Sequence, residues 1–280
     1  MSRYPIAVLV VLAACFAAQT GALKLSGGKT VKSESNYFST VARIQTQVDS
    51  QPRIMMLGSS LTGRMGDRAQ AFDGVANLGC DGGSAMVTLR AMDRGVLPVA
   101  PVLIVELNTL AYDLKGAGKD IGTAIDSEWF KLGRRYPNLG ATARPTAFAY
   151  SWLMARKAAT STFSQEPLPV ATHPAPLTGA AAPLANSAAE MLVQEALGIL
   201  SRLREKGTQI DLILLPPGEA PDSTEWAVAH SLAIHSGLPF WDLSADLPPG
   251  TVAFTDGRHL DAASAQKVLM TLMRELGGER

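Results

Sequence analysis

Two short stretches near opposite ends of the sequence carry side chains that together could perform nucleophilic chemistry. Residues 58–61 read Gly-Ser-Ser-Leu, and residues 256–259 read Asp-Gly-Arg-His. Asp256 and His259 stand three apart, so on one turn the carboxylate can fix the tautomer of an imidazole that takes the proton of a serine hydroxyl. The pattern predicts a serine nucleophile that attacks ester carbonyls. Two plainer interpretations stay open, because the serine could be an N-cap and Asp256 could cap a surface turn.

An alternating pattern of strands and helices positions these stretches. Continuous apolar runs predict buried strands over residues 53–57, 75–79, 102–107, 210–215 and, more weakly, 238–243. Helical patterns lie at residues 84–95, 185–206, 223–237 and 262–276. Together they predict an α/β fold, a three-layer sandwich with a central parallel sheet of about five strands and helices on both faces. Ligands bind beyond the carboxyl ends of such strands, which is where residues 58–61 come.

The 280 residues suffice for one large domain, which we place over residues 51–280. Residues 23–50 are polar and predict a lead-in segment with one helix around residues 37–48. Residues 112–183 interrupt the alternation and predict a partly helical insertion that ends in a flexible loop. The aromatic side chains of this insertion could form its own small core or offer faces for sugar stacking. They are Trp129, Tyr136, Tyr150 and Trp152.

Residues 1–22 have the layout of a bacterial secretory signal peptide. Arg3 gives a positive start, residues 6–18 are uninterruptedly apolar, and small residues lead to an expected cleavage after Ala22. The apolar run is shorter than the roughly 20 residues of a membrane span, which favours export over anchoring. Two alternatives stay open: lipidation of Cys15, which ends a lipobox-like Leu-Ala-Ala-Cys, and an uncleaved membrane anchor. Each of these three N-terminal fates predicts a protein that works outside the cytoplasm, in the periplasm or after secretion.

The composition excludes two other classes of protein. Hydrophobic residues make up 47% and charged residues 18% of the chain, unlike a disordered protein. Lys and Arg number 25, as do Asp and Glu, so no basic excess predicts a nucleic-acid partner. None of the four histidines stands in a Cys/His cluster with metal-ligand spacing, and we expect no metal and no other cofactor.

The order of four short blocks resembles the SGNH hydrolases, also called GDSL hydrolases. The blocks are Gly58-x-Ser60-Leu61, Asn77-Leu78-Gly79-Cys80-Asp81-Gly82, Asn108 after a predicted strand, and Asp256-x-x-His259-Leu260. The resemblance spans residues 53–276, leaves the insertion unmatched, and is most specific in its two end blocks. It implies a flavodoxin-like sandwich and acyl transfer through a covalent ester on a serine.

The resemblance implies a role for each matching residue. Ser60 resembles the family's nucleophile, His259 its general base, and Asp256 the carboxylate that orients the base. The oxyanion hole implied by the family consists of the backbone N–H groups of Ser60 and Gly82 and the side chain of Asn108.

Four positions leave alternatives open. Ser59 replaces the aspartate of the family's first block and could itself be the nucleophile, although position favours its neighbour. Gly79 is the fallback for Gly82. Asn108 stands outside the family's Gly-x-Asn-Asp pattern and could fall short of the oxyanion. Glu106, in the strand before it, is interpreted as a structural hydrogen-bond partner rather than a proton-transfer group.

A chain that has both an export signal and a Gly-Ser-Ser block resembles the family members that acylate bacterial polysaccharides such as alginate or cellulose. The resemblance implies a serine esterase or O-acyltransferase for acyl groups, acetyl above all, of an extracellular or cell-envelope glycan. A membrane acyl-transport protein is an expected partner. Two other functions stay open: a lipid-directed esterase or lysophospholipase with an apolar acyl groove, and a non-catalytic envelope scaffold.

Overall fold

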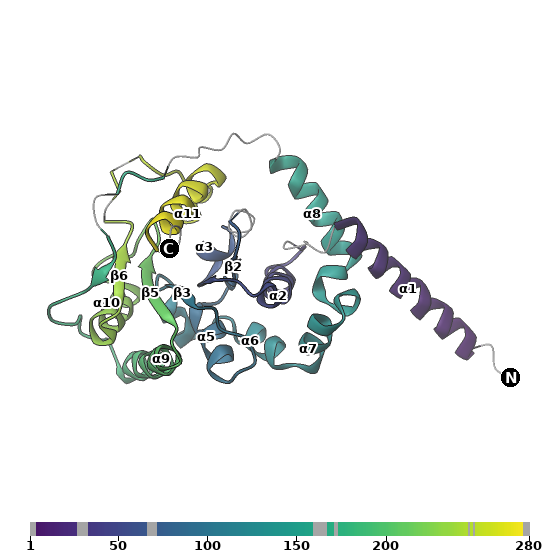
Figure 1. Ribbon diagram of the computed structural model, residues 1–280, viewed down its shortest axis with the longest axis horizontal. Coiled ribbons are helices and arrows are strands. Elements are labelled where there is room, and N and C mark those ends of the chain that lie inside the picture. The colour runs from purple at the N-terminus through teal and green to yellow at the C-terminus, as the bar shows by residue number, and fades with distance from the viewer. Residues whose placement is uncertain are drawn as a thin grey trace.

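The strands form one mixed sheet with helices on both faces (Figure 1). The computed structural model describes residues 4–26, 33–65, 72–158, 167–170, 173–245, 247–248 and 250–276. The strands are β1 (Ile54–Leu57), β2 (Val75–Asn77), β3 (Val102–Glu106), β4 (Ala175–Pro176), β5 (Gln209–Leu214) and β6 (Pro239–Asp242). Their order across the sheet is β2-β1-β3-β5-β6-β4. The sheet therefore places the carboxyl ends of β1 and β3 next to each other.

Parallel pairing joins all strands except β4. In β1, Ile54 lies opposite Val75 of β2 on one side and Val102 of β3 on the other. β5 pairs in parallel with β3, and β6 with β5. β4 adds an antiparallel edge to β6, with Ala175 opposite Phe240, and the sequence pattern did not predict it. The predicted α/β class with helices on both faces is confirmed.

Alternate side chains of β1 enter two separate cores, one on each face of the sheet. Met55 and Leu57 belong to the larger core, and Ile54 and Met56 to the smaller one. The larger core packs under α2 (Asn36–Gln47), α5 (Ala85–Asp93), α9 (Ser187–Glu205) and α10 (Thr224–Ser236), and the smaller one under α3 (Ser60–Gly63) and α11 (Ala262–Leu276). Because successive strand residues point to opposite faces, a strand covered on both is apolar throughout. This is why continuous apolar runs located the strands.

α2 belongs to the core although its sequence is largely polar. Val41 and Ile44 are fully buried, and the buried guanidinium of Arg43 pairs with Asp81, after β2, at 3.1 Å. The predicted lead-in segment over residues 23–50 therefore contains a helix on which the turn after β2 rests.

The segment between β3 and β4 is mostly helical. It contains η2 (Leu110–Lys115), α6 (Lys119–Asp126), α7 (Glu128–Arg135), η3 (Pro137–Leu139), η4 (Ala141–Ala143) and α8 (Pro145–Ala158). α6 and α7 pack against α2, whereas α8 packs against α1. Of the predicted insertion over residues 112–183, residues 159–166 and 171–172 lie outside the described residues.

The N-terminal apolar segment forms one long helix, α1 (Tyr4–Ser26). An 18-residue window within its stretch Tyr4–Leu25 has a mean hydropathy of 2.2, and the stretch could cross a membrane by length and composition. The helix runs through Ala22, the predicted cleavage point, and projects from the body of the molecule (Figure 1). Such a helix is compatible with a signal peptide or with an anchor.

Gly79 allows the turn after β2 to lie directly against α3. A Cβ at this residue would lie 2.3 Å from Gly63 N and 2.7 Å from Ser59 O, which are backbone atoms and cannot rotate away. We expect Gly79→Ala to lower the free energy of unfolding by about 1–3 kcal/mol, measured by urea denaturation. The matched control is Gly122→Ala in α6, where the added carbon meets no atom within 4 Å and should stabilise the helix by about 0.5–1 kcal/mol. An unchanged stability of Gly79→Ala would contradict the close approach.

Candidate active site

Ser60 is the first residue of α3, immediately after the turn that leaves β1. Ser59 is the N-cap, with extended backbone and an Oγ that accepts from Leu61 N at 3.1 Å. Gly58 has no space for a side chain, because a Cβ there would lie 2.5 Å from Oε2 of Glu106. The turn thus places the hydroxyl of Ser60 at the carboxyl edge of the sheet.

A short loop before α11 holds His259. Phe254 and Leu260 form an antiparallel bridge, and Thr255 N donates to His259 O at 2.8 Å. Gly257 has a φ of 78°, in the left-handed region that favours glycine. Because these constraints close the loop tightly, the imidazole of His259 has a defined direction toward α3.

A chain of hydrogen bonds links the three side chains that the sequence singles out. Ser60 Oγ lies 2.8 Å from His259 Nε2, and His259 Nδ1 lies 2.8 Å from Asp256 Oδ2 and 3.0 Å from Oδ1. The carboxylate accepts the Nδ1 hydrogen, which leaves the lone pair of Nε2 facing the serine. The imidazole can therefore accept the hydroxyl proton of Ser60 without any movement of the loop.

Hydrogen bonds from His259, the residue that Asp256 orients, hold Asp256 in its ionised form. Its Oδ1 accepts from the backbone N–H of His259 at 2.9 Å and of Arg258 at 3.2 Å. The hydrogen bonds from His259, first from its backbone and then from its ring, hold the pKa of Asp256 far below the usual value of an aspartate. An ionised carboxylate keeps the imidazole proton on Nδ1.

Arg64 also contacts this carboxylate, and the sequence analysis did not identify it. Its Nη1 lies 3.1 Å from Asp256 Oδ2. Both side chains are about half exposed, at 49% and 46%, so solvent screens the pair. The contact positions Asp256 more than it stabilises the fold. Its signal was the spacing of four residues between Ser60 and Arg64, which places both on the same side of a helical turn.

Glu106 organises the turn that carries Ser60. Its carboxylate is fully buried, and Oε2 accepts from Ser59 N at 2.7 Å, from Ser59 Oγ at 2.8 Å and from Thr62 Oγ1 at 3.2 Å. Oε1 accepts from the N–H and the hydroxyl of Thr109, each at 3.3 Å. The predicted structural role of Glu106 is confirmed. Ser59 points its hydroxyl at Glu106 rather than at an imidazole, so the geometry favours Ser60 as the nucleophile.

We expect Glu106→Gln to lower the free energy of unfolding by about 1–3 kcal/mol, because an amide N–H2 would face donors that need an acceptor. Urea denaturation measures the effect. The matched control is Glu190→Gln on the exposed side of α9, which should change stability by less than about 0.5 kcal/mol. Equal stabilities of the two variants would contradict the role assigned to Glu106.

The turn after β2 contributes the second predicted block. Asn77 is fully buried; its Nδ2 donates to Thr62 O at 2.6 Å and its Oδ1 accepts from Gly79 N at 2.9 Å. The N–H of Gly79, the fallback oxyanion donor, is therefore already engaged. Gly82 lies in an exposed turn with a φ of 80°, and no acceptor for its N–H occurs among the described residues. Of the two glycines, Gly82 keeps a donor available.

Asn108 links the ends of two strands through its side-chain amide. Its side chain is fully buried, with Nδ2 donating to Leu215 O at 2.9 Å and Oδ1 accepting from Leu215 N at 2.8 Å. The amide also faces Glu219 Oε1 at 3.5 Å. Leu215 follows the end of β5 and precedes Pro216 and Pro217, which have no N–H, so its backbone needs a side-chain partner. The amide of Asn108 thus joins the end of β3 to that of β5, and its oxyanion role stays a prediction.

Glu219 lies beside Asn108 and contacts Arg258, in the loop that holds His259. Its side chain is only 8% exposed, and Oε1 accepts from Arg258 Nη2 at 2.6 Å. Burial raises the pKa of Glu219, and the nearby charge of Arg258 opposes the rise only in part. The folded state therefore binds a proton at pH values at which the unfolded chain has lost it.

This shift predicts a pH-dependent stability. The contribution of Glu219 is fully present below the ordinary pKa of 4.5 and is lost as the pH rises through the higher pKa of the folded state. We expect the wild type to lose stability relative to Glu219→Gln as the pH rises from about 4.5 toward neutrality, measured by urea denaturation at each pH. A difference between the two proteins that is constant over this range would contradict the shift.

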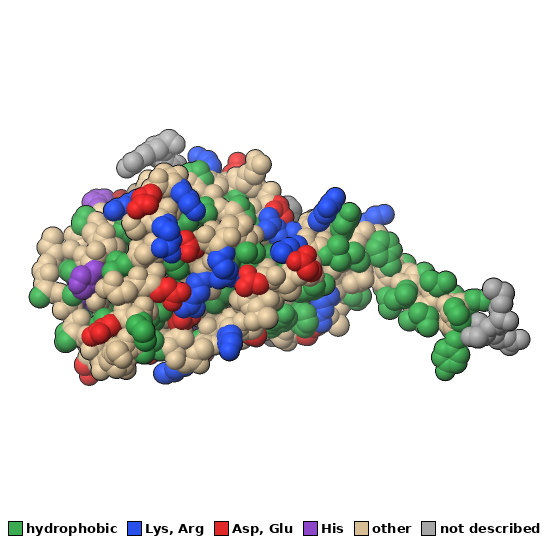
Figure 2. Space-filling model, turned by 90° about the horizontal axis from the view of Figure 1, so that it is seen from below, with side chains coloured by type: hydrophobic (Ala, Val, Ile, Leu, Met, Phe, Trp, Pro, Cys, Tyr) green, Lys and Arg blue, Asp and Glu red, His purple; other side chains and the backbone are tan. Residues whose placement is uncertain are grey.

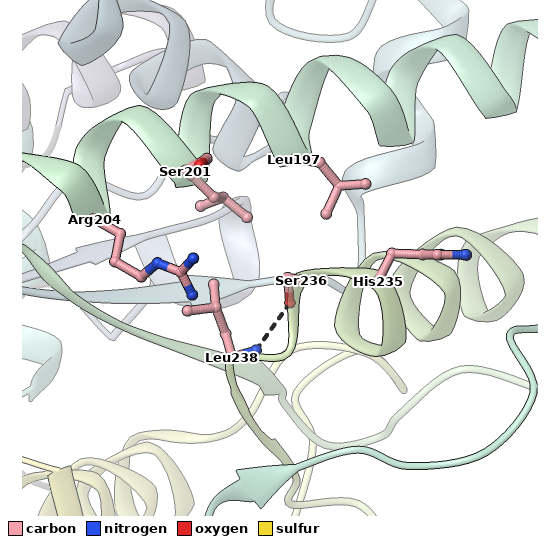
Figure 3. Close-up of a pocket in the computed structure, with 7 residues that line it drawn as sticks. Leu197, Ser201, Arg204, His235, Ser236 and Leu238 are labelled. Atoms are coloured by element: carbon pink, nitrogen blue, oxygen red, sulfur yellow. Dashed lines mark hydrogen bonds between the residues drawn. The ribbon is translucent and has the colours of Figure 1, made fainter.

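A cavity between α9 and α10 also contains a serine and a histidine, but they are not paired (Figure 3). It has a volume of about 190 Å³ and is lined by Ser201 and His235 among others. Ser201 Oγ donates to Glu205 at 3.1 Å, whereas His235 Nδ1 lies 2.8 Å from Ser231 O and points away from Ser201. This cavity therefore lacks a chain of hydrogen bonds like the one that links Ser60 to His259 and Asp256.

The aromatic residues singled out in the insertion belong to α7 and α8 or directly follow α7, and these two helices lie away from α3 (Figure 1). Trp129, Tyr136, Tyr150 and Trp152 are between 37% and 49% exposed. Phe130 is the buried aromatic residue of α7. The interpretation of these four side chains as a small core of their own is therefore wrong.

No family model matches the chain, and no curated protein and no solved structure matches it either. Among the described residues, no group of three or more His, Cys, Asp and Glu side chains could hold a metal ion. The function of the chain must therefore be inferred from its own residues. The most specific geometry among them is the hydrogen-bonded series Ser60, His259 and Asp256, which we call the relay.

Proposed function

We propose that this chain is a serine esterase or O-acyltransferase of the SGNH type. Its substrates are acyl groups, acetyl above all, on an extracellular or cell-envelope polysaccharide such as cellulose or alginate. One observation carries the proposal: Ser60 Oγ lies 2.8 Å from His259 Nε2 while Asp256 holds the opposite ring nitrogen at 2.8 Å. These are the distances that nucleophilic catalysis by a serine requires.

The sheet supports the SGNH-type fold within this proposal. Without the short edge strand β4, the strand order is β2-β1-β3-β5-β6, which is the order of flavodoxin-like doubly wound sheets. In such sheets, ligands bind beyond the carboxyl ends of the strands where the order reverses, between the first and third strands. Ser60 follows β1, and Glu106 ends β3, so the relay stands at this position.

The mechanism follows from the relay. Ser60 Oγ attacks the carbonyl carbon of the ester while its proton passes to His259 Nε2. The backbone N–H groups of Ser60 and Gly82 are the proposed donors to the oxyanion, each worth roughly 3 kcal/mol in comparable serine enzymes. The bond between the carbonyl carbon and the sugar oxygen breaks, and His259 returns the proton to that oxygen.

The second half of the reaction decides the class of enzyme. If water attacks the acyl-serine, His259 takes its proton and the products are a free acid and the serine. If a sugar hydroxyl attacks, His259 takes its proton, the acyl group passes to that oxygen and the serine is regenerated. In this second case a membrane acyl-transport protein is the proposed source of the acyl donor, and the alcohol of that donor, not the sugar, is the group released in the first step.

The test uses the purified full chain in mild detergent, with Ser60→Ala as its matched control. We expect hydrolysis of p-nitrophenyl acetate in preference to the palmitate ester. We also expect removal of acetyl groups from acetylated oligosaccharides, or their transfer to unmodified ones, followed by mass spectrometry. Each activity should be absent from Ser60→Ala.

Other results would favour the alternatives. Preferential cleavage of the palmitate ester or of a lysophospholipid would contradict the glycan substrate and favour a lipid-directed esterase. No turnover and no transfer with any of these esters would favour a non-catalytic scaffold.

A further inference from the structure

The side chains of α1 are apolar along the helix, and the protein covers almost none of them. Only 6% of the most apolar 18-residue window within Tyr4–Leu25 is buried. The 23 residues of α1 extend over about 34 Å, slightly more than the roughly 30 Å hydrocarbon core of a bilayer. Figure 2 shows the hydrophobic side chains of α1 leaving the body as an uncovered rod, with Lys and Arg side chains gathered near its base. Lys24, in the last turn, is one exposed cation of this region.

The C-terminal end of α1, in contrast, is docked on the domain. α1 contacts α8, η3 and η4. Ala22 is only 5% exposed, and Thr20 Oγ1 accepts from Asn138 Nδ2 at 3.4 Å. The predicted cleavage point after Ala22 therefore lies inside a continuous helix and against the protein. A chain that keeps this helix therefore has the root of α1 fixed against α8, η3 and η4.

Exposed apolar side chains flank the base of α1. Trp129 and Leu132, at positions i and i+3, lie on one side of α7, and Tyr136 is the residue that follows the helix; each is at least 37% exposed. Trp152 and Leu153 of α8 are 48% and 56% exposed. α8 contacts α1 directly, and α7 contacts η3, which also contacts α1. Neither helix lies next to α3 (Figure 1). Tryptophan and tyrosine are the side chains that membrane–water interfaces favour, because each has an apolar ring and a polar group.

We infer that α1 remains attached as a membrane anchor and that the exposed faces of α7 and α8 rest on the surface of the same phospholipid bilayer. The insertion then serves to hold the domain against the membrane rather than to stack sugars. The inference goes beyond the proposed function and does not depend on Ser60. It adds that the relay works on molecules that reach the membrane surface.

The first test concerns the anchor. Full-length protein is produced in a bacterial host, membranes are washed with alkaline carbonate, and the retained protein is examined by intact mass and N-terminal sequencing. We expect a membrane-bound chain that still contains residues 4–26. A soluble chain that begins at Leu23 would overturn the inference.

The second test concerns α7 and α8 and uses the tryptophans of the chain. There are four, Trp129, Trp152, Trp226 and Trp241, and none lies in α1. The full chain is reconstituted in phosphatidylcholine–phosphatidylglycerol vesicles with lipids brominated near the headgroup end of the acyl chain, which quench nearby tryptophans. We expect quenching of the wild type, its loss in the double variant Trp129→Phe/Trp152→Phe, and its retention in the control Trp226→Phe. An anchored protein that is not quenched, or is quenched equally in the double variant, would overturn the inferred contact of α7 and α8 with lipid.

Discussion

Replacing Ser60 with alanine should reduce the rate of ester cleavage by on the order of 10⁶-fold, as loss of the serine does in other serine triads. The reason is that Ser60 Oγ is the oxygen that faces His259 Nε2 at 2.8 Å. The hydrolysis of p-nitrophenyl acetate by purified variants measures the effect. Stability should change little, because the hydroxyl is at the edge of the sheet and only half-buried.

The neighbouring serine provides the matched control for this experiment. Ser59→Ala removes an N-cap and one donor to the buried carboxylate of Glu106, which should lower the free energy of unfolding by about 1–2 kcal/mol. Most of the activity should remain, because Ser59 does not face His259. The reverse pattern, with Ser60→Ala active and Ser59→Ala inactive but folded, would assign the nucleophile to Ser59.

Asp256→Asn should slow ester cleavage by about 10⁴-fold, because an amide allows the imidazole to hold its proton on the wrong nitrogen. In the wild type, the carboxylate accepts from His259 Nδ1 and from the backbone N–H of His259. The affinity for substrate should change less than the rate, since Asp256 does not touch the acyl group. Steady-state kinetics that separate kcat from KM measure this difference.

Arg64→Gln is the control for the charge around Asp256. Arg64 contacts the carboxylate from solvent at 3.1 Å, so its removal should cost far less activity than Asp256→Asn. An equal loss of activity in the two variants would contradict the claim that the Asp256 carboxylate keeps the ring proton of His259 on Nδ1. It would indicate that the contact with Arg64 is the essential one.

The strands and most helices could be predicted from the sequence because their burial leaves a local pattern. β3 is apolar over four successive residues since it is covered on both faces. The predicted helix over residues 262–276 has the bounds of α11. α2 could not be recognised as part of the core, because its buried polar groups have distant partners: Gln45, for example, donates to Phe130 O and accepts from Ala141 N.

Part of the candidate site could likewise be predicted from the sequence, and part could not. Asp256 and His259 could be nominated from their spacing on one turn, and Ser60 from its place after the first predicted strand and from the resemblance of its block; the structure brings the three together. The hydrogen bonds of Asn108 could not be foreseen, because its partner Leu215 is 107 residues away in the chain and follows another strand. Sequence spacing identifies groups that act on one turn, whereas contacts between strand ends depend on the sheet order.

The most direct test of the central claim is to map where a fluorophosphonate probe attaches to the native protein. The claim is that His259 activates the oxygen of Ser60. Peptide mass spectrometry of the labelled chain should find the adduct on Ser60, and both His259→Ala and prior unfolding should abolish it. A native protein that carries no adduct, or carries it on another serine, would contradict the account.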